Sequence, residues 1–151
     1  MKGLSLTQPW ASLVDIKAKR LETRSWRTDY RGPLVICAAK GYPKWAQETY
    51  LEKPFLDALS PHFSNARELP TGAALCLVNL LACVKTTELY RLDAIRFKID
   101  AHEIHFGDFS EGRYAWALEH VRSFAQPIPI RGALGFFDVP DRIITESLTA
   151  R

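Results

Sequence analysis

The sequence predicts an α+β fold, a small closed or half-closed β-barrel with peripheral helices. Apolar segments typical of strands occur at residues 4–6, 34–39, 73–84, 113–118 and 128–139. Two segments with helical spacing, 9–17 and 42–59, lie between these strands, and such a mixture favours one curled sheet with helices around it. The chain has 151 residues, of which 47% are hydrophobic, so it can bury its own core as one domain, 1–151.

The first third of the chain is expected to alternate between strands and a helix. Residues 4–6 alternate as a short strand, and a helix begins near Pro9 because proline suits a first helical turn. Trp10, Leu13 and Val14 then follow at spacings of three and four. The charged segment 19–26 reads as the next strand, and a turn at 29–33 leads into the β-branched, buried strand 34–39.

The remainder is expected to be more irregular. Pro54 argues that residues 42–59 form two helices rather than one uninterrupted helix. Residues 62–70 form a polar loop, and the near-continuous apolarity of 73–84 predicts a long strand covered on both faces. Residues 87–108 are amphipathic and mixed, 113–118 alternate as a strand, and glycines in 128–139 predict a bend or bulge there. The predicted inner face of the helices consists of Trp45, Tyr50, Leu51, Phe55 and Leu56.

The composition limits the classes of ligand and partner that we expect for this chain. The net charge of +3 permits an anionic ligand but falls short of the basic footprint of a tight duplex binder. No apolar run is long enough to span a bilayer and the N-terminus lacks a signal-peptide core, so we expect a cytoplasmic protein without membrane contact, with a monomer favoured.

No metal or cofactor is expected from the sequence. The cysteines, Cys37, Cys76 and Cys83, form no C-x-x-C and lie in apolar segments, so they are interpreted as reduced core residues. His102 and His105 lie three residues apart with no third ligand in view, so they are interpreted as surface residues.

The segment 19–26 is the strongest candidate site. Alternation along a strand would place Arg20, Glu22, Arg24 and Trp26 on one face. A carboxylate between two guanidiniums, beside an indole, suits a planar ligand rich in hydrogen-bonding edges, such as a nucleotide or nucleoside. The alternative is a solvated ladder of ion pairs on the surface.

Four motifs resemble those of the ASCH domain family. They are Q-P-W-A at 8–11, K-x-x-E-x-R-x-W at 19–26, Y-R-G-P at 30–33 with I-C-A-A at 36–39, and G-D-F-S-x-G-R-Y-A-W at 107–116. The resemblance covers about residues 4–139. It implies a PUA-like β-barrel, a fold associated with recognition of RNA and modified bases, with a cleft lined by these motifs. One departure is Lys17, which stands where the family signature has glycine. If that position needs a positive φ, lysine incurs a steric cost and the local turn could differ.

The resemblance also implies candidate catalytic residues. Family members are described as nucleic-acid binders, ribonucleases, or amidohydrolases that remove acyl groups from the exocyclic amine of cytidine. By position, the lysine of the small amidohydrolases corresponds to Lys19, whereas Glu22 stands in place of their threonine. Lys19 could act as a base on water with Glu22 as proton shuttle, or Thr23 or Ser110 could supply a hydroxyl. The distant carboxylate stays open among Glu68, Glu88, Glu103 and Glu119.

Further residues are candidates for binding. Arg24 and Arg113 could clamp a phosphate or stabilise an amide oxyanion. Trp26, Tyr114 and Trp10 could stack on a base, although Trp10 also suits a core. The remaining candidates are Gln8, for the edge of a pyrimidine or for capping the helix, Tyr30, and Lys40, for a backbone phosphate.

The resemblance therefore implies recognition of a cytosine-type base, as a nucleoside or within single-stranded RNA. Hydrolysis of acylated cytidine is the favoured function. A non-catalytic RNA-binding module is one alternative. A ribonuclease is another, with its base and cation taken from Lys19, Lys40, Tyr30 or Ser110.

Overall fold

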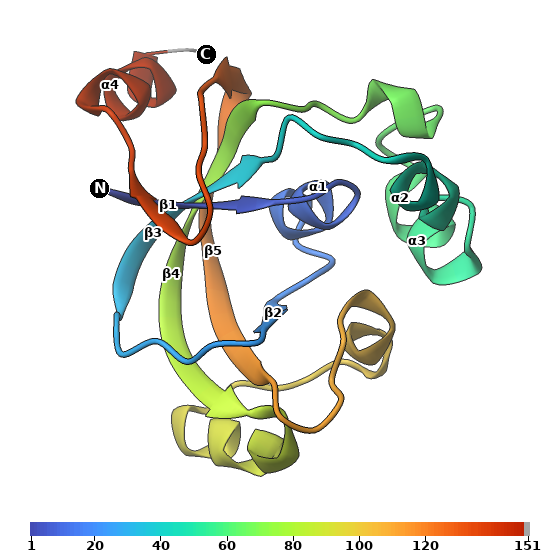
Figure 1. The fold of residues 1–151 in the computed structure, drawn as a ribbon, viewed down its shortest axis with the longest axis vertical. Coiled ribbons are helices and arrows are strands. Elements are labelled where there is room, and N and C mark those ends of the chain that lie inside the picture. Colours follow the sequence, from blue (N-terminus) through green and yellow to red (C-terminus); the bar gives the residue numbers. More distant parts are fainter. Residues whose placement is uncertain (150–151) are drawn as a thin grey trace.

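The computed structural model describes residues 1–149 and contains one six-stranded sheet surrounded by short helices (Figure 1). The strands are β1 (Lys2–Leu6), β2 (Leu21–Arg24), β3 (Gly32–Ala38), β4 (Ala73–Lys85), β5 (Tyr114–Pro129) and β6 (Phe136–Asp138). The helices are α1 (Trp10–Asp15), α2 (Lys44–Thr49), α3 (Lys53–Leu59) and α4 (Asp141–Thr149), with 3-10 helices η1 (Ala66–Glu68), η2 (Thr86–Ile95) and η3 (Ala101–Phe106).

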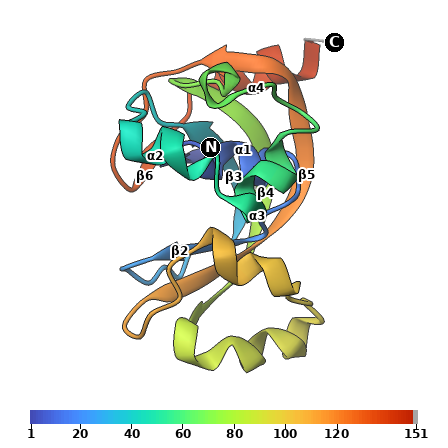
Figure 2. The ribbon, with the colours of Figure 1, turned by 90° about the vertical axis from the view of Figure 1, so that its right-hand side faces the viewer.

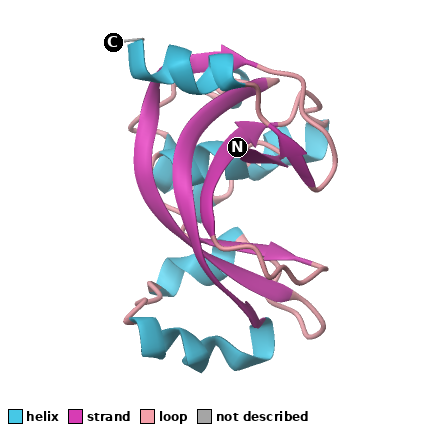
Figure 3. Cartoon of the chain, turned by 90° about the vertical axis from the view of Figure 1, so that its left-hand side faces the viewer, coloured by secondary structure: helices cyan, strands magenta, loops and turns pink. Residues whose placement is uncertain are grey.

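The sheet curls into a half-barrel, which confirms the predicted fold class. Its strand order is β2-β5-β4-β3-β1-β6, and all neighbours are antiparallel except β1 and β3. The long strands β4 and β5 bend strongly along their length (Figure 3). Their pairing shifts register at three places, and such irregularities increase local twist and bending.

Apolar side chains fill the inside of this curl. The main core combines residues of β1, α1, β3, β4 and β5, and it includes Leu34, Ile36, Val78 and the fully buried Trp116. Helices α2 and α3 pack near α1 around Leu13, Tyr50 and Phe55, on one side of the sheet (Figure 1). The segments η2 and η3 lie at the other end, beside β2 (Figure 2).

Several sequence predictions need correction. Residues 42–59 do form two helices, with Pro54 in the first turn of α3. However, Trp45 and Leu51 are exposed rather than part of the inner face. The predicted strands 113–118 and 128–139 differ from the structure, because β5 is one strand of 16 residues and β6 is separate and short. Helix α4 was not predicted from the sequence.

No helix within residues 1–149 has the length and apolarity needed to cross a membrane. The three cysteines are free thiols, as predicted, although Cys83 is only partly buried.

Candidate functional site

A cavity of about 620 Å³ lies between β2, the start of α1, helices α2 and α3, and the segment that follows η3. Aromatic rings form part of its wall: Trp10, Trp26, Trp45, Phe55 and Phe106. The polar part consists of hydroxyl, charged and imidazole side chains, chiefly Glu22, Thr23, Arg24, His105, Asp108 and Arg113. Such a mixture of apolar walls and a few convergent polar groups is typical of sites for small ligands.

The turn before β2 is formed around Lys17. Its φ of 69° lies in the left-handed region, so this position does need a positive φ. Ala18 N–H donates to Leu13 O and Lys17 N–H donates to Val14 O, which is the pattern of a Schellman helix end. Lysine therefore adopts the turn that glycine would favour, at a steric cost.

This turn directs Lys19 into the interior. The Lys19 ammonium donates to Leu21 O at 2.6 Å and to Phe106 O at 2.9 Å, and it lies 3.5 Å from Glu22 Oε1. Burial lowers the pKa of Lys19, while the nearby Glu22 and Glu103 carboxylates act in the opposite direction. Three acceptors around one nitrogen match the three donors of an ammonium group, whereas a neutral amine has only two. Lys19 is fully buried behind the cavity wall and does not line it.

Glu103 is the one member of the four candidate carboxylates that lies next to this lysine. Its two oxygens accept hydrogen bonds from the backbone N–H groups of Arg20 and Leu21, at 2.6 and 3.3 Å. Burial raises the pKa of Glu103, and these hydrogen bonds and the Lys19 charge offset part of that effect. Glu103 therefore fixes the start of β2.

Glu22 is the carboxylate of β2 that lines the cavity. It lies between Lys19 on one side and Arg24 on the other, with Arg24 Nε 3.1 Å from Glu22 Oε2. Arg24 Nη2 also donates to Ser5 O of β1 at 3.0 Å, across the mouth of the curled sheet. Arg20 does not share a face with Glu22 and Arg24, so its predicted position is wrong. Its guanidinium instead stacks on the Phe97 ring, 4.3 Å from the centroid, and Nη1 donates to Lys98 O.

The segment after η3 contributes the part of the cavity lining that lies beside β2. Thr23 Oγ1 accepts a hydrogen bond from Asp108 N–H at 3.1 Å, and Arg113 Nη2 donates to Thr23 O at 3.2 Å. A Cβ at Gly107 would lie 3.1 Å from Thr23 Oγ1, so glycine permits this close approach. The Ser110 hydrogen bonds lower the pKa of the exposed Asp108 carboxyl, with a smaller contribution from Arg113.

Two indoles are held in place by other rings. Trp26 packs edge-on against Trp116, with centroids 4.7 Å apart, and against Phe136 at 5.4 Å. Trp10 packs against Trp45 at 5.9 Å, and 61% of the Trp45 surface is exposed. Both Trp26 and Trp10 line the cavity and could stack on a planar ligand.

The cavity brings together about half of the residues predicted from the sequence. Glu22, Thr23, Trp10, Arg24, Trp26 and Arg113 line it. Gln8 does not, because its buried amide is bonded to Ser12 and to Pro70 O. The other predicted residues outside the lining are Lys19, Tyr30, Lys40, Ser110 and Tyr114.

The contacts of these residues explain why they lie outside the cavity lining. Tyr30 donates its hydroxyl proton to Pro33 O, and Lys40 is an exposed residue beside Gly72. Ser110 N–H donates to Asp108 Oδ1, on the exposed side of the loop. Tyr114 packs against the main core instead.

Comparison with known proteins identifies the family. The model of the ASCH domain matches residues 4–128, which is most of the chain. This chain belongs to the ASCH domain family. ASCH domains have a PUA-like, RNA-binding fold.

Relatives agree with this assignment. Activating signal cointegrator 1 from Homo sapiens and from Mus musculus is 35% identical over 81 residues. That match covers 54% of this chain but only 14% of either relative. The fold also resembles solved structures from Zymomonas mobilis, an ASCH protein and a mutant of the ASCH protein, with TM-scores of 0.55 and 0.54. Each is 12% identical and aligns with 98% of this chain and with 93% and 96% of its own, respectively.

Sequence reasoning missed two lining residues of this ASCH domain. Trp45 was assigned to the inner face of the helices. His105 was assigned to the surface, and it is exposed there while also lining the cavity. Both reach the cavity because α2 packs beside α1 and because η3 ends against β2. The sequence spacing of these residues contains no signal for either contact.

Proposed function

We propose that this ASCH domain binds one nucleobase with an exocyclic amine, of the cytosine type, from a nucleoside or an unpaired RNA nucleotide. The observation that carries the proposal is the Glu22 carboxylate, which is held between two cations and exposed to a cavity lined with indoles.

Glu22 suits the amine of such a base. A carboxylate offers about four lone-pair positions. The Lys19 and Arg24 nitrogens lie 3.5 and 3.1 Å from its two oxygens as ion-pair partners, which leaves acceptor positions for an amine donor. Cytosine presents an N–H donor at its exocyclic position, whereas uracil presents an acceptor that the carboxylate would repel. Recognition by Glu22 would therefore discriminate between these two bases.

The rest of the cavity suits the remainder of a nucleotide. Trp26 and Trp10 provide flat surfaces for the base, and such stacking is worth about 1–3 kcal/mol per base. Arg113 lines the same cavity and offers a guanidinium for a phosphate or a ribose oxygen. The volume of about 620 Å³ lies within the usual range for small-molecule sites.

Tryptophan fluorescence is the direct test, because indoles line the cavity. We expect cytidine and a cytidine-rich single-stranded RNA to quench the emission, with uridine binding about tenfold more weakly. Glu22→Gln should remove this preference, and Glu111→Gln, at an exposed position outside the cavity, should not. Equal affinity for cytidine and uridine in the wild type would refute the proposal. A steep loss of RNA affinity with salt would identify a polymer rather than a nucleoside as the ligand.

Hydrolysis of acylated cytidine is a second candidate, favoured by the presence of Glu22 and Thr23 on one cavity wall. In this reaction water attacks the acyl carbonyl, the bond from that carbon to the exocyclic nitrogen breaks, and a proton moves to the departing amine. Lys19 is buried outside the cavity lining and donates to two carbonyl oxygens, so Glu22, which lines the cavity, is better placed than Lys19 to accept the proton of water. Lys19 would then position Glu22.

Chromatography would detect this reaction after incubation with N4-acetylcytidine. We expect release of cytidine and acetate by the wild type, with a loss of at least about 100-fold in Glu22→Gln. Thr23→Val tests whether the threonine hydroxyl is the nucleophile, because turnover that persists in this variant would exclude that role. Because Thr23 Oγ1 also accepts from Asp108 N–H, a loss of turnover counts only if cytidine still binds. If the substrate binds but is not hydrolysed, only the binding function is supported. A ribonuclease has less support, because Lys40, Tyr30 and Ser110 lie outside the cavity.

A further inference from the structure

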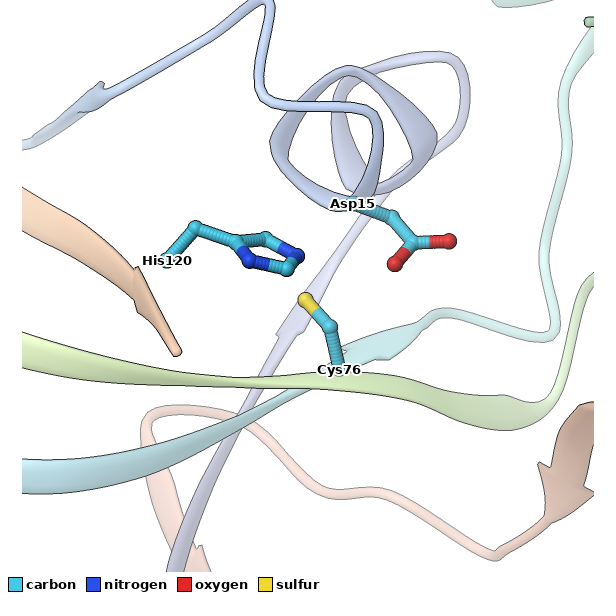
Figure 4. A group of neighbouring side chains, drawn as sticks. All are labelled: Asp15, Cys76 and His120. Atoms are coloured by element: carbon cyan, nitrogen blue, oxygen red, sulfur yellow. The ribbon is translucent and has the colours of Figure 1, made fainter. Parts of the chain in front are cut away.

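A second polar cluster lies away from the cavity, at the end of α1. It consists of Asp15 of α1, Cys76 of β4 and His120 of β5, whose side chains converge on one point (Figure 4). Their ligand atoms, a carboxylate oxygen, the thiol sulfur and an imidazole nitrogen, all lie within 4.8 Å of one another. None of the three residues lines the cavity.

An irregularity in the sheet produces this convergence. Cys76 pairs with Ser123, and Val78 pairs with His120, with a register shift between Leu77 and Val78. In a regular strand, residues 120 and 123 would point to opposite faces, because their separation is odd. The extra residue in β5 brings the side chains of residues 120 and 123 onto the same face. His120 Nε2 therefore lies 3.0 Å from Ser123 Oγ. Bulges often re-aim side chains in this way beside functional sites.

The three donors match the chemistry of a borderline transition metal. Zinc takes thiolate, imidazole and carboxylate ligands at about 2.0–2.3 Å in a tetrahedral arrangement, which places the ligand atoms about 3.3–3.8 Å apart. A shift of about 1 Å would bring the present cluster to that spacing. Cys76 is fully buried, whereas Asp15 and His120 are only partly buried, so an ion would approach the cluster from the side of the carboxylate and the imidazole.

The surroundings hold two of these side chains in place. Ser123 Oγ donates to Asp15 Oδ1 at 2.6 Å and also contacts His120, as outer-shell partners of metal ligands do. Burial raises the pKa of Asp15, and Ser123, His120 and His62 act in the opposite direction. Lys17 is a cation near His120, and its charge opposes a metal ion.

We propose that Asp15, Cys76 and His120 form a mononuclear site for a divalent transition metal of the zinc class. Binding would displace the thiol proton to solvent, so affinity should rise with pH. The sequence alone favoured no metal, because these three residues lie far apart in the chain and meet only through the register of β4 and β5.

Cobalt(II) is the probe, because a bound thiolate gives it a charge-transfer absorption that carboxylate and imidazole ligands do not. The full chain, without an affinity tag, would be titrated with cobalt(II) and then with zinc(II) as competitor. We expect one equivalent of cobalt(II), a thiolate band, and loss of that band on addition of zinc(II). Asp15→Asn and His120→Gln should each weaken binding at least about tenfold, and Cys76→Ala should abolish the band.

Matched controls come from the same chain. Cys83→Ala removes a thiol from the same strand outside the cluster, and His105→Gln removes a histidine from the cavity, so both should bind as the wild type does. The absence of a thiolate band in the wild type, or a band that survives Cys76→Ala, would overturn the proposal. If Cys76→Ala does not fold, unchanged affinity in both Asp15→Asn and His120→Gln would overturn it equally.

Discussion

The corner where β2 meets η3 and the core between β3 and β4 are both buried, yet they are built from opposite kinds of side chain. The corner contains Lys19, Glu22 and Glu103, each bonded to a specific backbone or side-chain partner. The core contains aliphatic residues such as Leu34 and Ile36, which contact many neighbours without directional bonds. A substitution in the corner therefore leaves unpaired polar atoms, whereas one in the core leaves only a small void.

Lys19→Met should give the largest effect, because it leaves Glu22 and two buried carbonyl oxygens without their cation. Removing one partner from such a buried arrangement typically costs about 3–5 kcal/mol. Urea denaturation would measure this loss in the free energy of unfolding. Lys53→Met, which breaks an exposed ion pair with Asp57, should change it by less than about 1 kcal/mol. Similar losses in the two variants would show that the buried polar contacts of Lys19 stabilise the fold no more than an exposed ion pair does.

Glu103→Gln should have the next largest effect. An amide has one oxygen, so one of the N–H groups of Arg20 and Leu21 would face an NH₂ group instead of an acceptor. An unpaired buried donor costs about 1–3 kcal/mol. The same denaturation assay applies, with the exposed Glu111→Gln as the control, and a stable Glu103→Gln protein would contradict the assigned role.

Ile36→Val tests the apolar side of the comparison. Loss of one methyl group from this fully buried position should cost about 0.5–1.5 kcal/mol, because neighbouring side chains relax only in part. A cost equal to that of Lys19→Met in the same assay would remove the contrast between corner and core.

Lys17→Gly should give the smallest effect and the opposite sign. The left-handed conformation costs a lysine about 1–2 kcal/mol, and the flexibility of glycine offsets part of that gain, so we expect about 0.5 kcal/mol of stabilisation. Thermal unfolding would detect it as a higher Tm. Arg96→Gly, at the other non-glycine residue with positive φ among residues 1–149, should behave alike. A lower Tm for Lys17→Gly would show that its side chain makes a stabilising contact.

The half-barrel could be predicted because the strand signals at 34–39 and 73–84 are strong and local. The wall formed by Glu22, Arg24 and Trp26 could be predicted too, since these residues belong to one short segment. The sequence left Gln8 open between a pyrimidine edge and a helix cap. The structure has its amide bonded to Ser12 at the start of α1, and its other partner, Pro70 O, is too distant in sequence to be predicted. Nor could the sequence place Trp45 or choose Glu103 among four carboxylates, because both depend on how separate helices pack. The roles proposed for the lining residues stay predictions.

The Arg24 side chain connects the two rims of the curled sheet. Strands β2 and β1 stand at opposite ends of the sheet order, apart from the short β6, and Arg24 joins them through its bond to Ser5 O. This hydrogen bond is a direct side-chain link between the two edges of the sheet. An anionic ligand that binds the Arg24 guanidinium would compete with Ser5 O for it. Loss of that bond would let the two edges separate, so the ligand's charge would influence how large a ligand the cavity admits.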